Sequence, residues 1–181
     1  MTERVPRSTV NCTDQWDDDA MRPADPAAVI PWEQARERLA AARMFWVATV
    51  RAGGGAPHVR PVFAVWVEGR LYSTSNRARA KARNLAADPH VAFTTTTEEI
   101  DFIVEGTAVP VTDEAELERV AEAYRAKYGW PLTVREGELY APYGAPAAGP
   151  PPYRPYAVTP EVIFGMGTND TLGPRSTRWR F

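Results

Sequence analysis

The sequence has almost no cysteine or histidine, with one cysteine (Cys12) and two histidines (His58 and His90) in 181 residues. A single cysteine excludes an internal disulfide, and so few ligands of these types make a zinc site unexpected. No apolar run approaches the roughly 20 residues that a membrane-spanning helix needs, and the polar, acidic N-terminus lacks the apolar core of a signal peptide. We therefore expect a cytoplasmic protein with no metal and no membrane partner.

An excess of positive charge is also missing. The chain has 21 Lys and Arg against 23 Asp and Glu, which gives a net charge of −2 and a pI of about 5.8. A general nucleic-acid binder normally carries a basic excess, so we expect no nucleic-acid partner. Lysine itself is rare, because only Lys81 and Lys127 are present and every other basic residue is Arg. In such a chain a lysine is expected where a compact point charge is needed.

The common catalytic motifs are absent as well. There is no nucleophile elbow, no phosphate-binding loop, no zinc signature and no Ser/His/Asp set. The glycine run 53–55 lacks the Lys-Ser/Thr ending of a phosphate-binding loop and lies between two apolar segments. We interpret it as a hairpin turn, and the sequence assigns no catalytic side chain.

The chain is predicted to form one domain, residues 31–181, after a flexible tail, residues 1–30, in which Asp and Pro are frequent and large apolar residues few. Apolar patterning predicts six mostly antiparallel strands at 44–50, 57–67, 71–74, 90–97, 100–111 and 155–166, the first three forming a meander. Helices are predicted at 32–43, 76–87 and 113–128, and the proline-rich segment 131–155 is predicted to be an irregular loop. The fold class is therefore mainly β, a small barrel with peripheral helices.

The third predicted helix has the clearest boundaries. Asp113 and Glu116 form a candidate capping box at its start, and Gly129 is suited to its C-terminal cap. Apolar residues recur along one face of the helix, so this face is expected to pack on the barrel.

The segment Ser73–Asn84 is the strongest candidate for a binding site. It carries four cations within seven residues: Arg77, Arg79, Lys81 and Arg83. A helix beginning near Ser75 or Asn76 would place cations in its first turn, where they oppose the helix dipole. This arrangement is tolerable where an anion binds, so the cluster predicts a phosphate site. The alternative is an ordinary solvated basic face.

Several stretches together resemble the pyridoxamine 5′-phosphate oxidase-like split-barrel family. They are PHVRPV on the second strand, LYSTS on the third, RAKARNLAADP on the following helix and EGTAVPV on the fifth strand. Within that family, the helix stretch and the ending TRWRF resemble the actinobacterial oxidoreductases that use flavins or deazaflavins. The resemblance covers roughly residues 32–111 well, and it implies a six-stranded antiparallel split β-barrel of the FMN-binding type.

The same resemblance implies a homodimer with cofactor sites between the subunits. It implies that Arg79 and Lys81 hold the cofactor phosphate with support from Ser75 and Asn84. It also places the backbone of Pro61 and Val62 against the cofactor ring, and it has Arg178 and Trp179 close the site from the partner subunit.

The function that follows is an oxidoreductase in which coenzyme F420 passes a hydride to an unsaturated small organic substrate. The acidic tail of this deazaflavin would require further cations, for which Arg60, Arg77 and Arg83 are available. One alternative is an FMN-dependent enzyme similar to pyridoxamine 5′-phosphate oxidase. Another is a non-catalytic protein that binds or carries a flavin or haem.

Aromatic residues and His58 leave further questions open. Tyr140, Tyr143, Tyr153 and Tyr156, in and just after the proline-rich segment, either cover a cofactor pocket or pack the segment onto the barrel. We favour packing. His58 follows the glycine turn and is interpreted as a surface residue of a strand.

Overall fold

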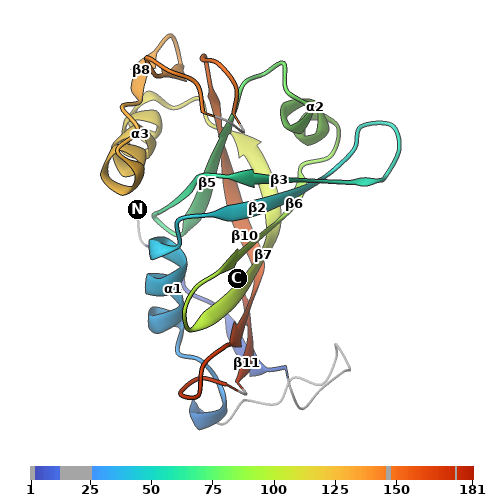
Figure 1. Ribbon diagram of the computed structural model, residues 1–181. Helices are drawn as coiled ribbons and strands as arrows, with labels where there is room; N and C mark the ends of the chain where they lie inside the picture. Colours follow the sequence, from blue (N-terminus) through green and yellow to red (C-terminus); the bar gives the residue numbers. More distant parts are fainter. Residues whose placement is uncertain (1–2, 13–25, 146–147, 174) are drawn as a thin grey trace.

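A computed structural model describes residues 3–12, 26–145, 148–173 and 175–181. It shows a long twisted sheet with helices at its periphery (Figure 1). The helices are α1 (Trp32–Ala41), α2 (Ala80–Ala87) and α3 (Glu114–Tyr128), with a short 3-10 turn at Pro26–Ala28. The strands are β1 (Ser8–Asn11), β2 (Phe45–Val50), β3 (Pro57–Val62), β4 (Ala64–Val67), β5 (Arg70–Ser75), β6 (His90–Thr96), β7 (Ile100–Pro110), β8 (Thr133–Arg135), β9 (Glu138–Tyr140), β10 (Arg154–Gly167) and β11 (Ser176–Arg180). The mainly β fold class is confirmed.

The predicted strand count is not confirmed, and the middle strand of the predicted meander is divided in two, although both predicted antiparallel pairings are present. Nine strands form the main sheet in the order β1-β11-β10-β7-β6-β2-β3, with β5 and β4 branching from β10. The predicted strand 57–67 divides at Phe63, after which β3 pairs with β2 and β4 pairs with β5. β3 and β4 are not paired with each other in the described sheet, so it is split at this point rather than closed.

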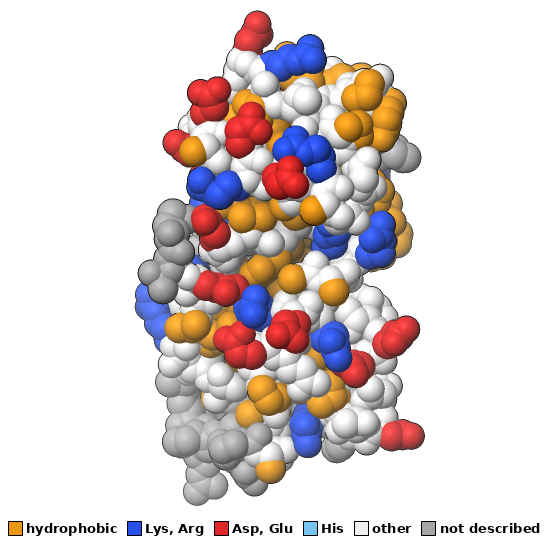
Figure 2. All heavy atoms as spheres, turned by 90° about the vertical axis from the view of Figure 1, so that its left-hand side faces the viewer, with side chains coloured by type: hydrophobic (Ala, Val, Ile, Leu, Met, Phe, Trp, Pro, Cys, Tyr) orange, Lys and Arg blue, Asp and Glu red, His pale blue; other side chains and the backbone are white. Residues whose placement is uncertain are grey.

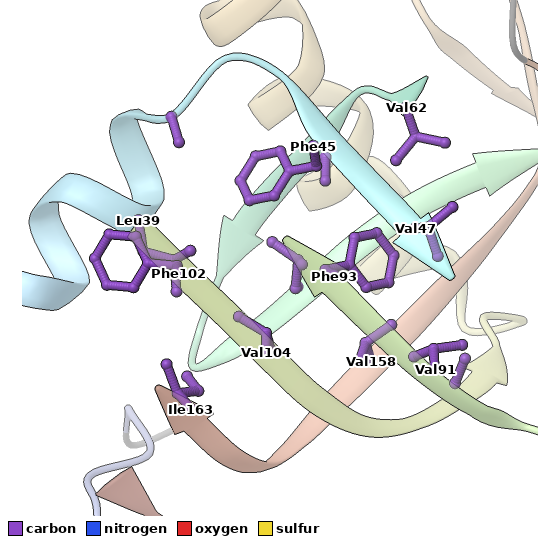
Figure 3. Close-up of a cluster of buried hydrophobic side chains, with 14 of the residues drawn as sticks. Leu39, Phe45, Val47, Val62, Val91, Phe93, Phe102, Val104, Val158 and Ile163 are labelled. Atoms are coloured by element: carbon purple, nitrogen blue, oxygen red, sulfur yellow. The ribbon is translucent and has the colours of Figure 1, made fainter. Parts of the chain in front are cut away.

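The main hydrophobic core lies inside the curve of the sheet. Along β2, Phe45 and Val47 are buried while Trp46 between them is about half exposed, as the alternation of side chains in a strand requires. Figure 3 shows Phe45 and Val47 facing Phe93 from β6, with Val158 from β10 beside them. The alternation therefore determines which face of β2 is buried, whereas β5 is buried on both faces from Leu71 to Ser75.

A second core lies between α3 and strands β4 and β5. The buried residues Leu117, Val120 and Tyr124 of α3 pack there. Asp113 caps the helix by accepting a hydrogen bond from the Glu116 backbone N–H (2.8 Å), and Gly129 ends it in the left-handed region at φ 65°. The predicted boundaries are confirmed, although the Glu116 carboxylate accepts from the Tyr72 hydroxyl instead of completing the capping box.

The prediction of a flexible tail is wrong for the described parts of residues 1–30. Strand β1 pairs with β11, and Val10 on it is buried. Ile30 is fully buried, and its backbone N–H donates to the Thr177 hydroxyl (2.8 Å). Few apolar residues are present in this segment; Val10, Val29 and Ile30 are buried, whereas Val5 is exposed. Residues 13–25 lie outside the described residues.

The prediction of an irregular loop at 131–155 also needs correction. Strands β8 and β9 form a small hairpin there, and Leu132, Leu139 and Tyr153 are fully buried. We call residues 129–153 the connector, because they join α3 to β10. Apolar anchors spaced along the connector fix it to the second core, and residues 146–147 within it are not described.

Charges of both signs are interspersed over the face that carries α1 and α3 (Figure 2). Exposed ion pairs on this face include Arg36 with Glu33, and Arg125 with Glu122. No described helix combines the length and the apolar character that crossing a membrane requires.

Candidate functional site

A cavity of about 120 Å³ opens beside the end of β3 and the start of α2. Its lining is mostly apolar and comes from five parts of the chain. Met44 precedes β2, Thr74 is on β5 and Lys81 is on α2. The end of β3 supplies Pro61, Val62 and the following Phe63, and the connector supplies Trp130, Ala145 and Ala148. The cavity therefore joins the segment of clustered cations to the strand end implied to face a cofactor ring.

Lys81 is the charged residue of this cavity. Its side chain is only 5% exposed, and its Nζ donates a hydrogen bond to the Thr74 carbonyl oxygen (2.7 Å). No carboxylate forms an ion pair with it among the described residues. Burial lowers the pKa of Lys81 to about 8. An ammonium group has three donors, and a buried one without an opposing charge is costly, so this position favours an anionic ligand.

Helix α2 begins later than predicted, at Ala80. The Asn76 side chain accepts a hydrogen bond from the Ala78 backbone N–H (2.8 Å) and so stabilises a turn in place of the first helical residues. Lys81 consequently lies in the first turn of the helix, where backbone N–H groups are unpaired within the helix and attract anions.

Arg79 precedes the helix as its N-terminal cap residue and is exposed. Its guanidinium group lies against Gly149 of the connector, where an added Cβ would be 2.6 Å from the Arg79 Nε. A side chain at Gly149 would therefore displace Arg79, and the glycine allows the connector to approach the start of α2.

Ser75 and Asn84 are both buried, but neither lines the cavity as the structure describes it. The Ser75 hydroxyl donates to the Asn76 carbonyl oxygen (3.2 Å). The Asn84 amide donates to the Thr49 hydroxyl (2.9 Å) and accepts from the Ala52 backbone N–H (3.2 Å). Asn84 therefore ties α2 to the β2–β3 hairpin, a structural role that the sequence did not reveal.

The other cations of the segment already have protein partners. Arg77 forms an ion pair with Glu138 of β9, and Arg83 donates to the Ala78 carbonyl oxygen (2.6 Å). Arg60 is exposed and donates to the carbonyl oxygen of Val59 (2.7 Å). Arg77 thus contributes to holding the connector in place.

The interpretation of His58 as a surface residue is wrong. Its side chain is buried, and its Nδ1 lies 3.4 Å from the Thr49 hydroxyl. Burial lowers the pKa of His58, and the neighbouring cations Arg60 and Arg51 lower it further. Burial and the nearby cations therefore both disfavour the charged imidazolium.

Arg178 and Trp179 lie on β11, away from the cavity of their own chain. The Trp179 side chain is fully buried in the main core and contacts Trp32, with ring centroids 5.6 Å apart. The expectation that this tryptophan covers a cofactor ring is therefore wrong for the side chain as folded. Arg178 is half-buried and lies directly opposite Phe164 and Val10 on the neighbouring strands.

Sequence reasoning missed the connector's share of the cavity. Trp130, Ala145 and Ala148 line it, whereas none of the four tyrosines considered does so in the described structure. Tyr153 instead packs the connector, because its hydroxyl donates to the Gly149 carbonyl oxygen (2.9 Å). In the sequence, the only indication of a role for Trp130 is its position directly after Gly129, the C-terminal cap of α3, where the chain turns back.

The described residues contain no group of three or more His, Cys, Asp and Glu side chains that could hold a metal ion. A phosphate-bearing cofactor fits the donors that are present, because Lys81 has unused hydrogen-bonding capacity beside an apolar cavity. The adjoining strand end presents backbone and the flat apolar surfaces of Pro61 and Phe63, which suit an aromatic ring.

Comparisons with solved structures show the fold. The chain resembles a conserved hypothetical protein from Mycobacterium tuberculosis (19% identity, 82% of this chain and 91% of that one, TM-score 0.61). It also resembles an FAD-binding protein from Mesorhizobium loti (14%, 82% and 93%, TM-score 0.54). A third neighbour is a heme binding protein from Mycobacterium smegmatis (19%, 87% and 59%, TM-score 0.57).

No curated protein sequence matches the chain. The family model for pyridoxamine 5′-phosphate oxidase, however, matches residues 31–166, which include every strand from β2 to β7, helix α2 and nearly all of β10. The expected resemblance is thereby confirmed, and this chain belongs to the pyridoxamine 5′-phosphate oxidase-like split-barrel family.

Proposed function

We propose that this protein is an oxidoreductase that binds coenzyme F420, with FMN as the alternative cofactor. The observation that carries the proposal is Lys81, a buried ammonium group with no carboxylate partner among the described residues, at the edge of an apolar cavity. In a family of flavin-binding split barrels, a phosphate group is the ligand that satisfies such a residue. The bound cofactor would supply hydride-transfer chemistry.

The chain's own residues would bind and orient this cofactor. Lys81 and Arg79 hold the phosphate in the proposal, with Ser75 and Asn84 fixing the backbone around it. The backbone of Pro61 and Val62 supports one face of the ring and excludes water from it. The proposed substrate is an unsaturated small organic molecule at the open face, and no side chain is assigned as acid or base.

The preference for coenzyme F420 over FMN rests on positive charge near the cavity. Arg60 is exposed on β3, and Arg79 is exposed at the start of α2. Of the three arginines proposed for the acidic tail, Arg77 is paired with the carboxylate of Glu138, whereas Arg60 and Arg83 each donate only to a backbone carbonyl oxygen, so these two are the candidates.

A carrier function for a flavin or haem is the rival from a different class. The fold alone permits it, since a heme binding protein and an FAD-binding protein share this fold. Lys81 alone does not separate the two functions, because it would pair equally with a haem propionate. We favour a phosphate-bearing redox cofactor because the matching family model is that of pyridoxamine 5′-phosphate oxidase.

The proposal includes a homodimer with the cofactor groove between subunits. A row of directly opposed residues crosses the outer face of the sheet: Trp46, Thr94, Ile103 and Phe164. Trp46 is 49% exposed, and Ile103 and Phe164 are partly exposed, so a second copy would cover apolar surface there. The edge of β3 lies next to this row, because Pro61 is opposite Trp46.

The experiment is a visible spectrum of the purified protein followed by titration with coenzyme F420, FMN and haem. Lys81→Met should weaken binding of the preferred cofactor by about 1.5–3 kcal/mol, the scale of a hydrogen bond to a charged group. Lys127→Met is the matched control, because Lys127 also donates to a backbone carbonyl (Ala64, 2.9 Å) and does not line the cavity. Equal affinities of the two variants would reject the phosphate site, and haem binding alone would favour the carrier.

A further inference from the structure

The point at which the sheet divides is also part of the cavity wall. Val62 ends β3, which pairs with β2, and Ala64 begins β4, which pairs with β5. Phe63 lies between the two strands, and we call residues 62–64 the division. Pro61, Val62 and Phe63 line the cavity, so the course of this short stretch of backbone determines the surface on which the proposed cofactor ring would lie.

Two tyrosines of α3 hold the division by its backbone. Ala64 is fully buried, and buried backbone N–H and C=O groups need hydrogen-bond partners. The Tyr128 hydroxyl accepts from the Ala64 backbone N–H (3.2 Å) and donates to the Ala64 carbonyl oxygen (2.8 Å). One helical turn earlier, the Tyr124 hydroxyl lies between two carbonyl oxygens, that of Phe63 (3.0 Å) and that of Tyr72 on β5 (3.1 Å). The last turns of α3 therefore fix the division relative to β5.

The ring of Tyr128 also fixes the side chain of Phe63. The two rings are stacked, with centroids 4.4 Å apart and an angle of 21° between their planes. Phe63 lines the cavity, whereas Tyr124 and Tyr128 do not. The two tyrosines can therefore affect a molecule in the cavity only through Phe63 and the backbone that they hold.

Both hydroxyls stay protonated at neutral pH and so keep donating to these carbonyl oxygens. Burial raises the pKa of Tyr128 to about 12, and it raises the pKa of Tyr124 well above its usual value. Lys127 donates to the same Ala64 carbonyl oxygen as Tyr128. Because Tyr128 remains on this oxygen when Lys127 is replaced, Lys127→Met should leave the division in place.

We propose that Tyr124 and Tyr128 are positioning residues of the cofactor site, which hold the division so that the end of β3 and the Phe63 ring form a fixed surface for the cofactor ring. This inference rests on the proposed function and extends it to α3, a helix with no side chain in the cavity lining as described. A surface that is already in place need not be ordered when the ligand binds, which favours affinity.

The test combines titrations with FMN and coenzyme F420 and the visible spectrum of the bound cofactor. Tyr128→Phe and Tyr124→Phe each remove one hydroxyl and keep the aromatic ring. Each should raise the dissociation constant of the preferred cofactor about fivefold, the scale of one hydrogen bond. Each should also shift the visible absorption band of the cofactor, because its ring would rest on a displaced surface.

Tyr72→Phe is the matched control. It removes the hydroxyl of another fully buried tyrosine in the second core, which donates to the Glu116 carboxylate (2.9 Å), and Tyr72 does not line the cavity. Urea denaturation should show a loss of stability in all three variants, whereas affinity and spectrum should change only in Tyr124→Phe and Tyr128→Phe. An equal change of affinity and spectrum in Tyr72→Phe would assign the effect to general destabilisation and overturn the proposal.

Amide hydrogen exchange of the ligand-free protein tests the contact with Ala64 separately from cofactor binding. The Ala64 amide should exchange several-fold faster in Tyr128→Phe than in the parent or in Tyr72→Phe. Faster exchange with parental affinity and an unchanged spectrum would mean that the tyrosines only stabilise the fold; the positioning role would then be wrong and the proposed function would stand.

Each hydroxyl is tested in its own variant, so the proposal remains open to refutation if one of the two variants does not fold. Parental binding and spectrum in whichever variant folds would reject it. A parent protein that binds neither FMN nor coenzyme F420 would reject the proposed function and this inference together.

Discussion

Lys81 and Lys127 are the only lysines of the chain, and both end on backbone carbonyl oxygens instead of carboxylates. Burial lowers the pKa of each to about 8. The rarity of lysine suggested that these two positions are special, and the structure gives a physical reason. Both sites require a slender side chain whose compact head can lie among apolar groups, which the broad guanidinium of Arg cannot do as readily.

These pKa values predict an unusual pH dependence of stability. From about pH 8 upward the unfolded chain holds protons on both lysines that the folded protein has lost. The free energy of unfolding should therefore rise up to about pH 9.5, by on the order of 2 kcal/mol for the almost fully buried Lys81. Above that pH the tyrosines whose pKa is raised by burial oppose the rise, because they ionise first in the unfolded chain. Urea denaturation from pH 7.5 to about 9.5 measures the rise.

Two lysine variants separate the contributions of Lys81 and Lys127 to the rise in the free energy of unfolding. Lys81→Met should remove a large part of the rise, and Lys127→Met a smaller part, because Lys127 is less buried. A full rise in the Lys81→Met protein would show that Lys81 does not carry a lowered pKa.

Cofactor binding should also be linked to protons at Lys81. A phosphate beside the ammonium group favours its charged form, so the pKa rises when the cofactor binds. Near pH 8.5 binding should therefore take up protons, and the calorimetric enthalpy should depend on the ionisation enthalpy of the buffer. Lys81→Met should abolish the buffer dependence at this pH; its persistence would place the phosphate elsewhere.

At the scale of elements, α3 was predictable and α2 was only partly so. The boundaries of α3 are set locally by Asp113 and Gly129, and local signals are visible in a sequence. The start of α2 depends on the turn at Asn76, which bonds to the connector more than 70 residues away. The division of the second predicted strand at Phe63 likewise depends on tertiary pairing. The apolar sequence continues through Phe63 without a break, so nothing local marks the division.

Strand β1 gives a prediction opposite to the sequence-based one. Its pairing with β11 and the burial of Val10 indicate that residues 3–12 stabilise the fold. Deleting residues 1–12 should lower the thermal midpoint by several degrees, since it exposes the edge of β11 and part of the core. Differential scanning calorimetry measures this. A variant with Val5→Ser, at an exposed site before β1, should melt like the parent.

On the scale of the whole molecule, the outer face of the sheet exposes apolar side chains that a second subunit would cover. Trp46, Met44 and Val59 are each 45–49% exposed on or beside β2 and β3. We predict a homodimer that buries more than about 2,000 Å² in total, the range of permanent assemblies. Sedimentation at low micromolar concentration should show dimer only. Trp46→Glu should produce monomer, and a monomer that binds cofactor with parental affinity would contradict a site shared between subunits.

The family was predictable from the sequence because the residues that identify it lie in contiguous stretches, above all the helix that carries Lys81. The site was predictable only in part. Lys81, Pro61 and Val62 come together around the cavity, whereas Trp130 and Ala148 reach it through long-range packing of the connector. Trp179 was misplaced because the resemblance of the ending TRWRF to a family does not reveal whether a side chain points inward.

The pairing of β1 with β11 has a consequence for synthesis on the ribosome. β1 is the first described strand to be made, yet its partner strand comes more than 160 residues later. Until β11 is made, the segment carrying Val10 has no partner strand in the sheet. The edge of β10 that pairs with β11 is also unpaired until then. A nascent chain arrested before residue 176 would therefore present one unpaired strand, β1, and one open edge of β10 to chaperones or to other chains.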